Sequence, residues 1–173
     1  VRAAGIEPGT PMLRVDADEV RERLQAVPEV ASVEVSLSWP STVQVRVVER
    51  VPAAFFVARD GIQLVDATGT PFQAVPEPPA GLPELKVREA SHADPATRAG
   101  MLVLTSVPEP VRSEITAVLA ENPNDIRLLL TGEREIEWGS QEEAEKKAAI
   151  LPALLTRPGK VYDVTTPALP TVS

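Results

Sequence analysis

The only histidine of the chain, His92, lies between Ser91 and Asp94. Serine, histidine and aspartate are the residue types of the hydrolase triad, in which the imidazole takes the serine proton and the carboxylate orients the ring. Residues this close in the chain seldom present their side chains in that relay, and no Gly-x-Ser-x-Gly nucleophile elbow occurs. A polar loop before a helix is the favoured interpretation, and a hydrolase is kept only as a minor alternative.

Carboxylates gather in two further stretches of the chain. Asp16, Asp18 and Glu19 could suggest a cation site, but acidic residues at a helix start are better explained by capping and by the helix dipole. No EF-hand spacing accompanies them. The second group could receive a basic partner segment, although a solvated face is the preferred interpretation. Its members are Glu133, Glu135, Glu137, Glu142, Glu143 and Glu145.

The composition disfavours several classes of function. With 25 acidic against 17 basic residues, the formal net charge is −8, whereas phosphate binding needs a basic face. The chain has no cysteine, which removes disulfides, thiolate catalysis and cysteine metal sites. It also lacks a Gly-rich phosphate loop and any apolar run of about 20 residues. We therefore expect no enzyme, no cofactor, no metal, no nucleic acid and no small-molecule substrate.

The elements that position these residues begin with a capped helix. Asp16 is the N-cap candidate, and Glu19 three residues later completes the pattern of a capping box. Pro28 ends the helix, because the residue before a proline is biased away from helical backbone. Apolar residues on one helical face recur at spacings of three and four, namely Ala17, Val20, Leu24 and Val27.

A hairpin follows this helix. From Val33 the apolar period changes to two, which predicts a strand over 33–39, a turn at 40–42 and a second strand from Val43 to Val47. Trp39 shares the apolar face of the first strand, so it is expected in the core, against the helix or the domain joint. Glu49 places a charge where an apolar residue is due, and a structural partner and a recruitment surface are equally weighted explanations.

The rest of the chain predicts short strands and two helices. Asp94 and Pro95 start one helix, and Ser140 with Glu143 forms a second capping box before a helix that contains Pro152. The proline-rich stretch 76–83 is the most linker-like segment. Strands are expected over 54–58, 62–65, 72–75, 85–87, 115–120, 125–131, 134–138 and 160–166.

Five stretches together resemble one protein family. The stretch PEVASVEVSLSWPSTVQVRVVERVPAAF resembles the end of the POTRA domain of the FtsQ (DivIB) family of bacterial cell-division proteins. Each stretch alone is unspecific, but the ordered set covers almost the whole chain. The other matching stretches are GIEPGTPMLRVD upstream and GIQLVDATGTPF, WGSQEEAEKK and YDVTTPALP downstream.

The resemblance implies an α+β protein with two domains. Residues 1–52 would form a POTRA-like α/β domain without its first strand, and residues 53–173 a mostly antiparallel β domain with two helices. A single continuous sheet is the alternative. The implied function is a cell-division scaffold, the extracytoplasmic part of a single-pass protein of the cell membrane, whose membrane anchor lies in a segment absent here. FtsB and FtsL are the implied partners. The runner-up function is a POTRA-type chaperone or peptide-binding module of a secretion or outer-membrane assembly system.

The last predicted strand is the best candidate for partner binding. An edge strand presents unpaired backbone groups to which an extended peptide can add. In the FtsQ family the partner FtsB adds a strand at the C-terminal edge, so the resemblance assigns this role here. We expect Tyr162 to be partly exposed, and a proline at Thr165 to block the partner if its N–H faces outward. The candidate residues are Lys160, Val161, Tyr162, Asp163, Val164, Thr165 and Thr166.

Overall fold

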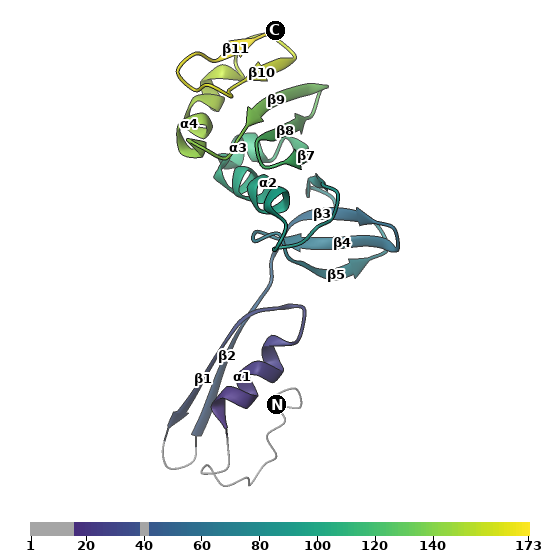
Figure 1. Ribbon diagram of the computed structural model, residues 1–173, viewed down its shortest axis with the longest axis vertical. Helices are drawn as coiled ribbons and strands as arrows, with labels where there is room; N and C mark the ends of the chain where they lie inside the picture. The colour runs from purple at the N-terminus through teal and green to yellow at the C-terminus, as the bar shows by residue number, and fades with distance from the viewer. Residues whose placement is uncertain (1–15, 39–41) are drawn as a thin grey trace. The chain divides into compact units, whose positions relative to one another are not determined.

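The computed structural model describes residues 16–38 and 42–173, and the chain forms two compact units, Val1–Val51 and Pro52–Ser173 (Figure 1). Sequence patterns place the boundary between Arg50 and Ala54. The predicted packing of Trp39 lies outside the described residues. Each unit has its own core, and the two are described separately.

The first unit is a helix on a hairpin, as the two apolar periods predict. Helix α1 (Ala17–Gln25) is followed by strands β1 (Val30–Ser38) and β2 (Thr42–Glu49), which pair antiparallel. The Asp16 carboxylate accepts hydrogen bonds from the N–H groups of Asp18 at 2.9 Å and Glu19 at 3.2 Å, so the N-cap is confirmed. The Glu19 carboxylate pairs with Arg23 at 2.6 Å instead of completing the predicted box.

Helix α1 covers only the base of this hairpin. Nine helical residues span about 14 Å, whereas nine strand residues span about 30 Å. Leu37, near the end of β1, therefore remains 38% exposed, although it continues the apolar alternation. The buried residues of this small core are Val20, Leu24, Val30 and Val33, with Val27, Val35 and Val45 partly buried against them.

The second unit is built on one nine-stranded sheet in the order β11-β10-β9-β8-β7-β6-β3-β4-β5. The neighbours β3–β6, β6–β7 and β9–β10 are parallel and the remaining neighbours are antiparallel, so the α+β class with a mostly antiparallel sheet is confirmed. The strands are β3 (Pro52–Ala58), β4 (Gly61–Asp66), β5 (Pro71–Val75), β6 (Glu84–Lys86), β7 (Ile115–Asn122), β8 (Asp125–Leu130), β9 (Arg134–Gly139), β10 (Val161–Asp163) and β11 (Thr171–Val172).

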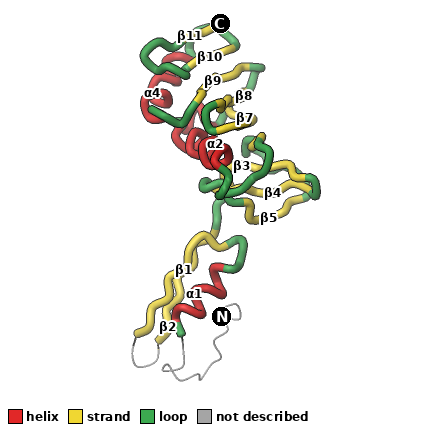
Figure 2. Tube along the Cα trace, viewed as in Figure 1, coloured by secondary structure: helices red, strands yellow, loops and turns green. Residues whose placement is uncertain are grey.

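Two helices and one short helical turn belong to this unit (Figure 2). They are α2 (Pro95–Ser106), α3 (Glu109–Arg112) and α4 (Ala144–Leu154). Asp94 caps α2 through the N–H of Thr97 at 2.7 Å. The second capping box is wrong, because Glu143 itself occupies the N-cap with a left-handed φ of 54° and makes no side-chain cap bond. Pro152 lies in the last turn of α4, which ends at Leu154.

The core of the second unit lies between the sheet and helices α2 and α4. Gly100 lets α2 approach β7 closely, because a Cβ at this position would lie 3.2 Å from Ala120 Cβ. Trp138 is fully buried, and it is the only aromatic side chain of β9. Helix α4 and β9 together form the platform on which the C-terminal strands lie.

Candidate protein-binding edge

The C-terminal edge of the sheet differs from its sequence-based prediction. The strand expected over 160–166 is only β10, Val161–Asp163, and it pairs on both sides. It lies parallel to β9 and antiparallel to β11, which the sequence did not reveal. The outermost strand is therefore β11, and β10 is not an edge strand.

The register of β11 determines which backbone groups it leaves free. The N–H of Val161 donates to the Ser173 carbonyl at 3.0 Å, and the N–H of Ser173 donates to the Val161 carbonyl at 3.0 Å. Asp163 lies opposite Thr171, and Tyr162 opposite Val172. Because backbone groups alternate between the two sides of a strand, the N–H and C=O of Val172 point away from β10. The sheet thus presents one free donor and one free acceptor at Val172.

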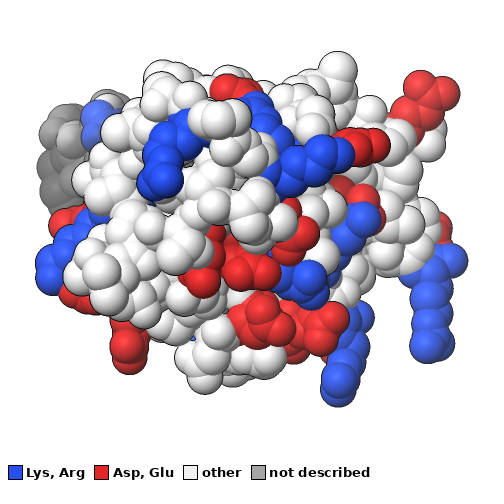
Figure 3. All heavy atoms as spheres, turned by 90° about the horizontal axis from the view of Figure 1, so that it is seen from above, with Lys and Arg blue, Asp and Glu red and all other residues white. Residues whose placement is uncertain are grey.

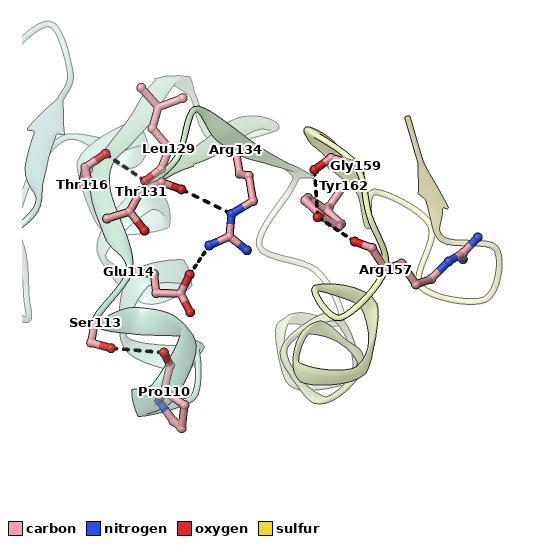
Figure 4. A network of polar contacts seen from close by, with 10 residues as sticks. All are labelled: Pro110, Ser113, Glu114, Thr116, Leu129, Thr131, Arg134, Arg157, Gly159 and Tyr162. Atoms are coloured by element: carbon pink, nitrogen blue, oxygen red, sulfur yellow. Dashed lines mark hydrogen bonds and ion pairs between the residues drawn. The ribbon is translucent and has the colours of Figure 1, made fainter.

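Tyr162 is buried, which corrects the expectation of partial exposure. Its side chain is 1% exposed, and its hydroxyl lies 2.9 Å from the Arg157 carbonyl and 3.0 Å from the Gly159 carbonyl (Figure 4). The single hydroxyl proton is shared between these two acceptors. The alternation of β10 directs Tyr162 into the core, where its hydroxyl reaches backbone carbonyls of the loop between α4 and β10. Tyr162 therefore anchors the edge and cannot itself touch a partner.

The residues after β10 turn away from the sheet. The Val164 side chain is fully buried, and its N–H donates to the Glu137 carbonyl at 3.0 Å. The Asp163 carboxylate accepts from the N–H of Thr165 at 2.8 Å and from its hydroxyl at 2.7 Å. The N–H of Thr165 is thus used locally, which overturns the idea of an outward donor at this position. Thr165 and Thr166 are exposed, and the Thr165 side chain lies beside Gly139 at the end of β9.

At the other end of β10, Lys160 pairs with Glu133 at 2.7 Å, and its own N–H donates to the Ser173 carbonyl at 2.7 Å. Both charged side chains are largely exposed, so this ion pair contributes little to stability. Val161 is half-buried beside it. The seven candidate residues are therefore contiguous, but they divide into buried anchors and exposed flanks.

A buried lysine that sequence analysis did not single out supports this platform. Lys147 of α4 is 2% exposed, and its ammonium donates to the carbonyls of Trp138 at 3.0 Å and Ser140 at 2.9 Å. Burial lowers the pKa of Lys147, while the carboxylates of Glu143 and Glu142 act in the opposite direction. The ammonium thereby ties α4 to the end of β9.

The acidic group does not form a single patch. Glu135 lies 3.5 Å from Arg127, and Glu143 pairs with Lys146 at 2.5 Å. Arg134 of β9 pairs with Glu114, which immediately precedes β7 (Figure 4). The face seen in Figure 3 likewise carries both signs of charge interspersed. A solvated surface explains these glutamates better than a basic partner segment does.

The candidate hydrolase residues are not arranged for catalysis. The Nδ1–H of His92 donates to the Thr68 carbonyl at 2.9 Å, and the Ser91 hydroxyl accepts from the N–H of Ala93 at 3.2 Å. The Asp94 carboxylate caps α2. Each group therefore has a structural contact with backbone. Within residues 16–38 and 42–173, no cluster of His, Cys, Asp or Glu could hold a metal ion.

Two family models match the chain along its two units. The model described as "POTRA domain, FtsQ-type" matches residues 1–50, and "Cell division protein FtsQ/DivIB, C-terminal" matches residues 55–165. This chain belongs to the FtsQ/DivIB family. The assignment confirms the family resemblance seen in the five sequence stretches. The FtsQ C-terminal match includes β9, α4 and β10, so the platform of the candidate edge belongs to the shared domain.

Curated relatives named cell division protein FtsQ agree with this assignment. The one from Mycobacterium leprae is 41% identical over 170 residues, which cover 98% of this chain and 50% of the relative. The Mycobacterium tuberculosis protein is 39% identical, with 98% and 54% covered. The Streptomyces griseus protein is 32% identical, with 98% and 86% covered. The chain spans about half the length of the mycobacterial relatives.

Among the helices of the described residues, none is long and apolar enough to cross a membrane.

Proposed function

We propose that this FtsQ chain is an extracytoplasmic scaffold of the division machinery that binds a partner by strand addition at its C-terminal edge. The observation that carries the proposal is the outward N–H and C=O of Val172, at the end of a sheet whose other backbone groups on β10 and β11 pair inward. A free strand edge is a template for an extended peptide, with backbone bonds for affinity and alternate side chains for specificity.

The opposite edge of the same sheet is less suited to this role. β5 begins at Pro71 and is followed by Pro76, and prolines at an edge strand remove donors and block pairing. The β11 edge instead carries Leu169 beside it, whose side chain is 78% exposed. An exposed leucine next to free backbone groups offers an apolar anchor for the incoming strand.

The segment Lys160–Thr166 keeps a role in this proposal, divided between two tasks. Tyr162 and Val164 hold the edge in place from within the core. Lys160, Thr165 and Thr166 are exposed at the two ends of the segment, where they are available to the ends of the partner strand. The partner-binding region is thus the segment that the sequence predicts, with β11 added as its outer strand.

The partners proposed from the family are FtsB, which supplies the added strand, and FtsL. A single membrane-spanning segment outside residues 1–173 holds the protein at the cell membrane, and the scaffold recruits and bridges division proteins at the septum. It performs no catalysis, in keeping with the structural contacts of Ser91, His92 and Asp94.

A POTRA-type chaperone of a secretion system is the alternative. Such a role would require the peptide to bind the first unit, as in tandem POTRA repeats. The match of residues 55–165 to the FtsQ C-terminal domain favours the division scaffold, because a second POTRA unit would have to occupy that stretch.

The experiment is a calorimetric titration of a synthetic FtsB segment against the wild type, Val172→Pro and Val172→Ala. Proline removes the outward N–H, whereas alanine keeps it and only shortens the side chain. Val172→Pro should weaken binding at least about tenfold, and more than Val172→Ala, which loses side-chain packing against Gly159 but keeps the outward N–H. Leu169→Ser should also weaken binding while leaving the thermal midpoint unchanged. Equal affinity for all four proteins would reject strand addition at β11.

A further inference from the structure

The sheet of the second unit opens beside the short internal strand β6. β6 has three residues and lies between β3, with seven, and β7, with eight. β3 pairs with β6 only at Phe55 and Glu84, whereas β6 stays paired with β7 as far as Lys86. Beyond that point β3 continues to Ala58 and β7 to Asn122, and none of the described strands lies between them. The strand groups β3–β5 and β7–β9 diverge here (Figure 1).

A cavity of about 450 Å³ occupies the opening. Its inner side is apolar, because Phe56 and Val87 line it and pack against the core. Its outer side carries Val57, which is 53% exposed, and the exposed cations Lys86 and Arg88. The cavity thus has one apolar wall and one charged wall, on which Lys86 and Arg88 lie together with the carboxylates of Glu84 and Glu121.

The backbone of β3 is ready to pair with such a strand. The N–H of Phe55 donates to the Pro83 carbonyl at 3.0 Å, on the side of β6. Backbone groups two residues apart point to the same side of a strand, so the N–H and C=O of Val57 face the cavity. Val57 has a register partner on β4, Ile62, but none on β6. One donor and one acceptor are therefore available where the β3–β6 ladder has ended, although β6 itself continues to Lys86.

The charged side chains at the rim of the cavity restrict which residue types a bound segment can carry there. In the described part of the chain, Lys86 has a carboxylate at 3.5 Å, that of Glu84, while Arg88 forms no ion pair. Glu121 lines the opposite rim, on β7, and would repel a second acidic residue there. A strand here would therefore direct one acidic side chain to Arg88 and its neighbouring side chains to Phe56 and Val87.

We propose that this gap is a second strand-binding site, which takes a short extended segment of a partner protein with the pattern apolar–acidic–apolar. The segment lies between the diverging ends of β3 and β6, pairs with the backbone of Val57 and directs its acidic residue to Arg88. In the order of the sheet, β6, β7, β8, β9 and β10 separate β3 from β11. The second site is therefore independent of strand addition at β11.

The test is a nuclear magnetic resonance titration of the nitrogen-15-labelled chain with the peptide acetyl-Ser-Val-Glu-Val-Ser-amide. A matched peptide has lysine in place of glutamate. The glutamate peptide should shift the amide signals of Val57 and Arg88 and bind at least about fivefold more tightly than the lysine peptide. Val57→Pro should weaken its binding about tenfold, because it removes the donor that faces the gap.

Reversing the charge of Arg88 is the most specific part of this test. Arg88→Glu should reverse the preference, so that the lysine peptide binds better. Arg59→Glu changes the net charge equally but lies in the β3–β4 turn, outside the cavity lining, and should leave the preference intact. Val172→Pro should have no effect here, which separates this site from the β11 edge.

Three results would overturn the second site. These are no binding of either peptide up to millimolar concentration, shifts confined to residues outside the cavity, or an Arg88→Glu variant that keeps the preference for glutamate. Circular dichroism and the thermal midpoint of each variant verify that it is folded.

Discussion

Val161 and Ser173 exchange two backbone hydrogen bonds, each 3.0 Å long. This pair fixes the last residues of the chain against β10 and decides which strand forms the edge of the sheet. It directs the backbone groups of Ser173 toward Val161 and leaves the backbone N–H and C=O of Val172 facing outward. The partner site of the proposed scaffold therefore depends on how firmly β11 is seated.

Gly159 provides the space in which β11 is seated. A Cβ at this position would overlap Val172 Cγ1 and lie 3.1 Å from the Ser173 carbonyl oxygen. Gly159→Ala should displace β11 and weaken the FtsB segment, at a stability cost of about 1–3 kcal/mol. The additional change Val172→Ala removes the overlapping methyl group and should restore binding. A double variant as weak as Gly159→Ala alone would show that the glycine acts in another way; urea unfolding and calorimetry measure both effects.

Tyr162 should matter for stability more than for contact with a partner. Tyr162→Phe loses the hydroxyl bond to the Arg157 and Gly159 carbonyls and should cost about 1 kcal/mol. Tyr162→Ala empties a fully buried site and should cost about 3–5 kcal/mol. Urea denaturation gives both values. If Tyr162→Ala unfolds at the wild-type urea concentration, the side chain is not buried as described.

The buried ammonium of Lys147 should make stability depend on alkaline pH. Its pKa is lowered in the folded state from the ordinary value of 10.5. Between the lowered pKa and 10.5 the unfolded state binds more protons at this site. The contribution of Lys147 to the free energy of unfolding therefore increases as the pH rises. Lys147→Met lacks this gain, whereas all other titrating groups are common to both proteins. From about pH 7 to about pH 10, the free energy of unfolding measured with urea should therefore change in a more stabilising direction in the wild type than in Lys147→Met. A change no larger than that of the methionine variant would contradict the lowered pKa.

His92 should be dispensable for division. Its ring donates one hydrogen bond to the Thr68 carbonyl from an exposed loop, so His92→Ala should cost no more than about 1 kcal/mol. Growth and septum spacing in a depletion strain that expresses the variant should equal the wild type. Failure to divide at normal abundance and stability would reopen the hydrolase alternative.

Local chemistry makes much of the fold predictable. The capping aspartates Asp16 and Asp94 begin their helices as expected, since a short carboxylate that accepts a backbone N–H acts within one turn. Leu37 is more exposed than its pattern predicts, because alternation shows which face a residue shares and not how far a helix reaches along that face. Ser140 and Glu143 have the spacing of a capping box but do not form one, because Glu143 itself occupies the N-cap in a left-handed conformation.

The C-terminal edge of the sheet is predicted in the right part of the chain but with the wrong outer strand, and its role in partner binding stays a prediction. β11 has two residues, too few for any period, and its pairing with β10 is specified by contacts such as that of Val172 with Gly159. The end of β10 is predictable from the sequence, because Asp163 and Thr165 have the spacing of an Asx turn. The burial of Lys147 is also predictable from the sequence, since it lies on the apolar face of α4 with Ala148 and Leu151.

Amide hydrogen exchange at Val172 tests strand addition most directly. In the free chain, the N–H of Ser173 is bonded to β10 while that of Val172 faces solvent, so Val172 should exchange faster. Saturation with the FtsB segment should slow exchange at Val172 by at least about tenfold, because a partner carbonyl then accepts its proton. A Val172 amide that still exchanges at its free rate in the saturated complex would contradict strand addition at this edge.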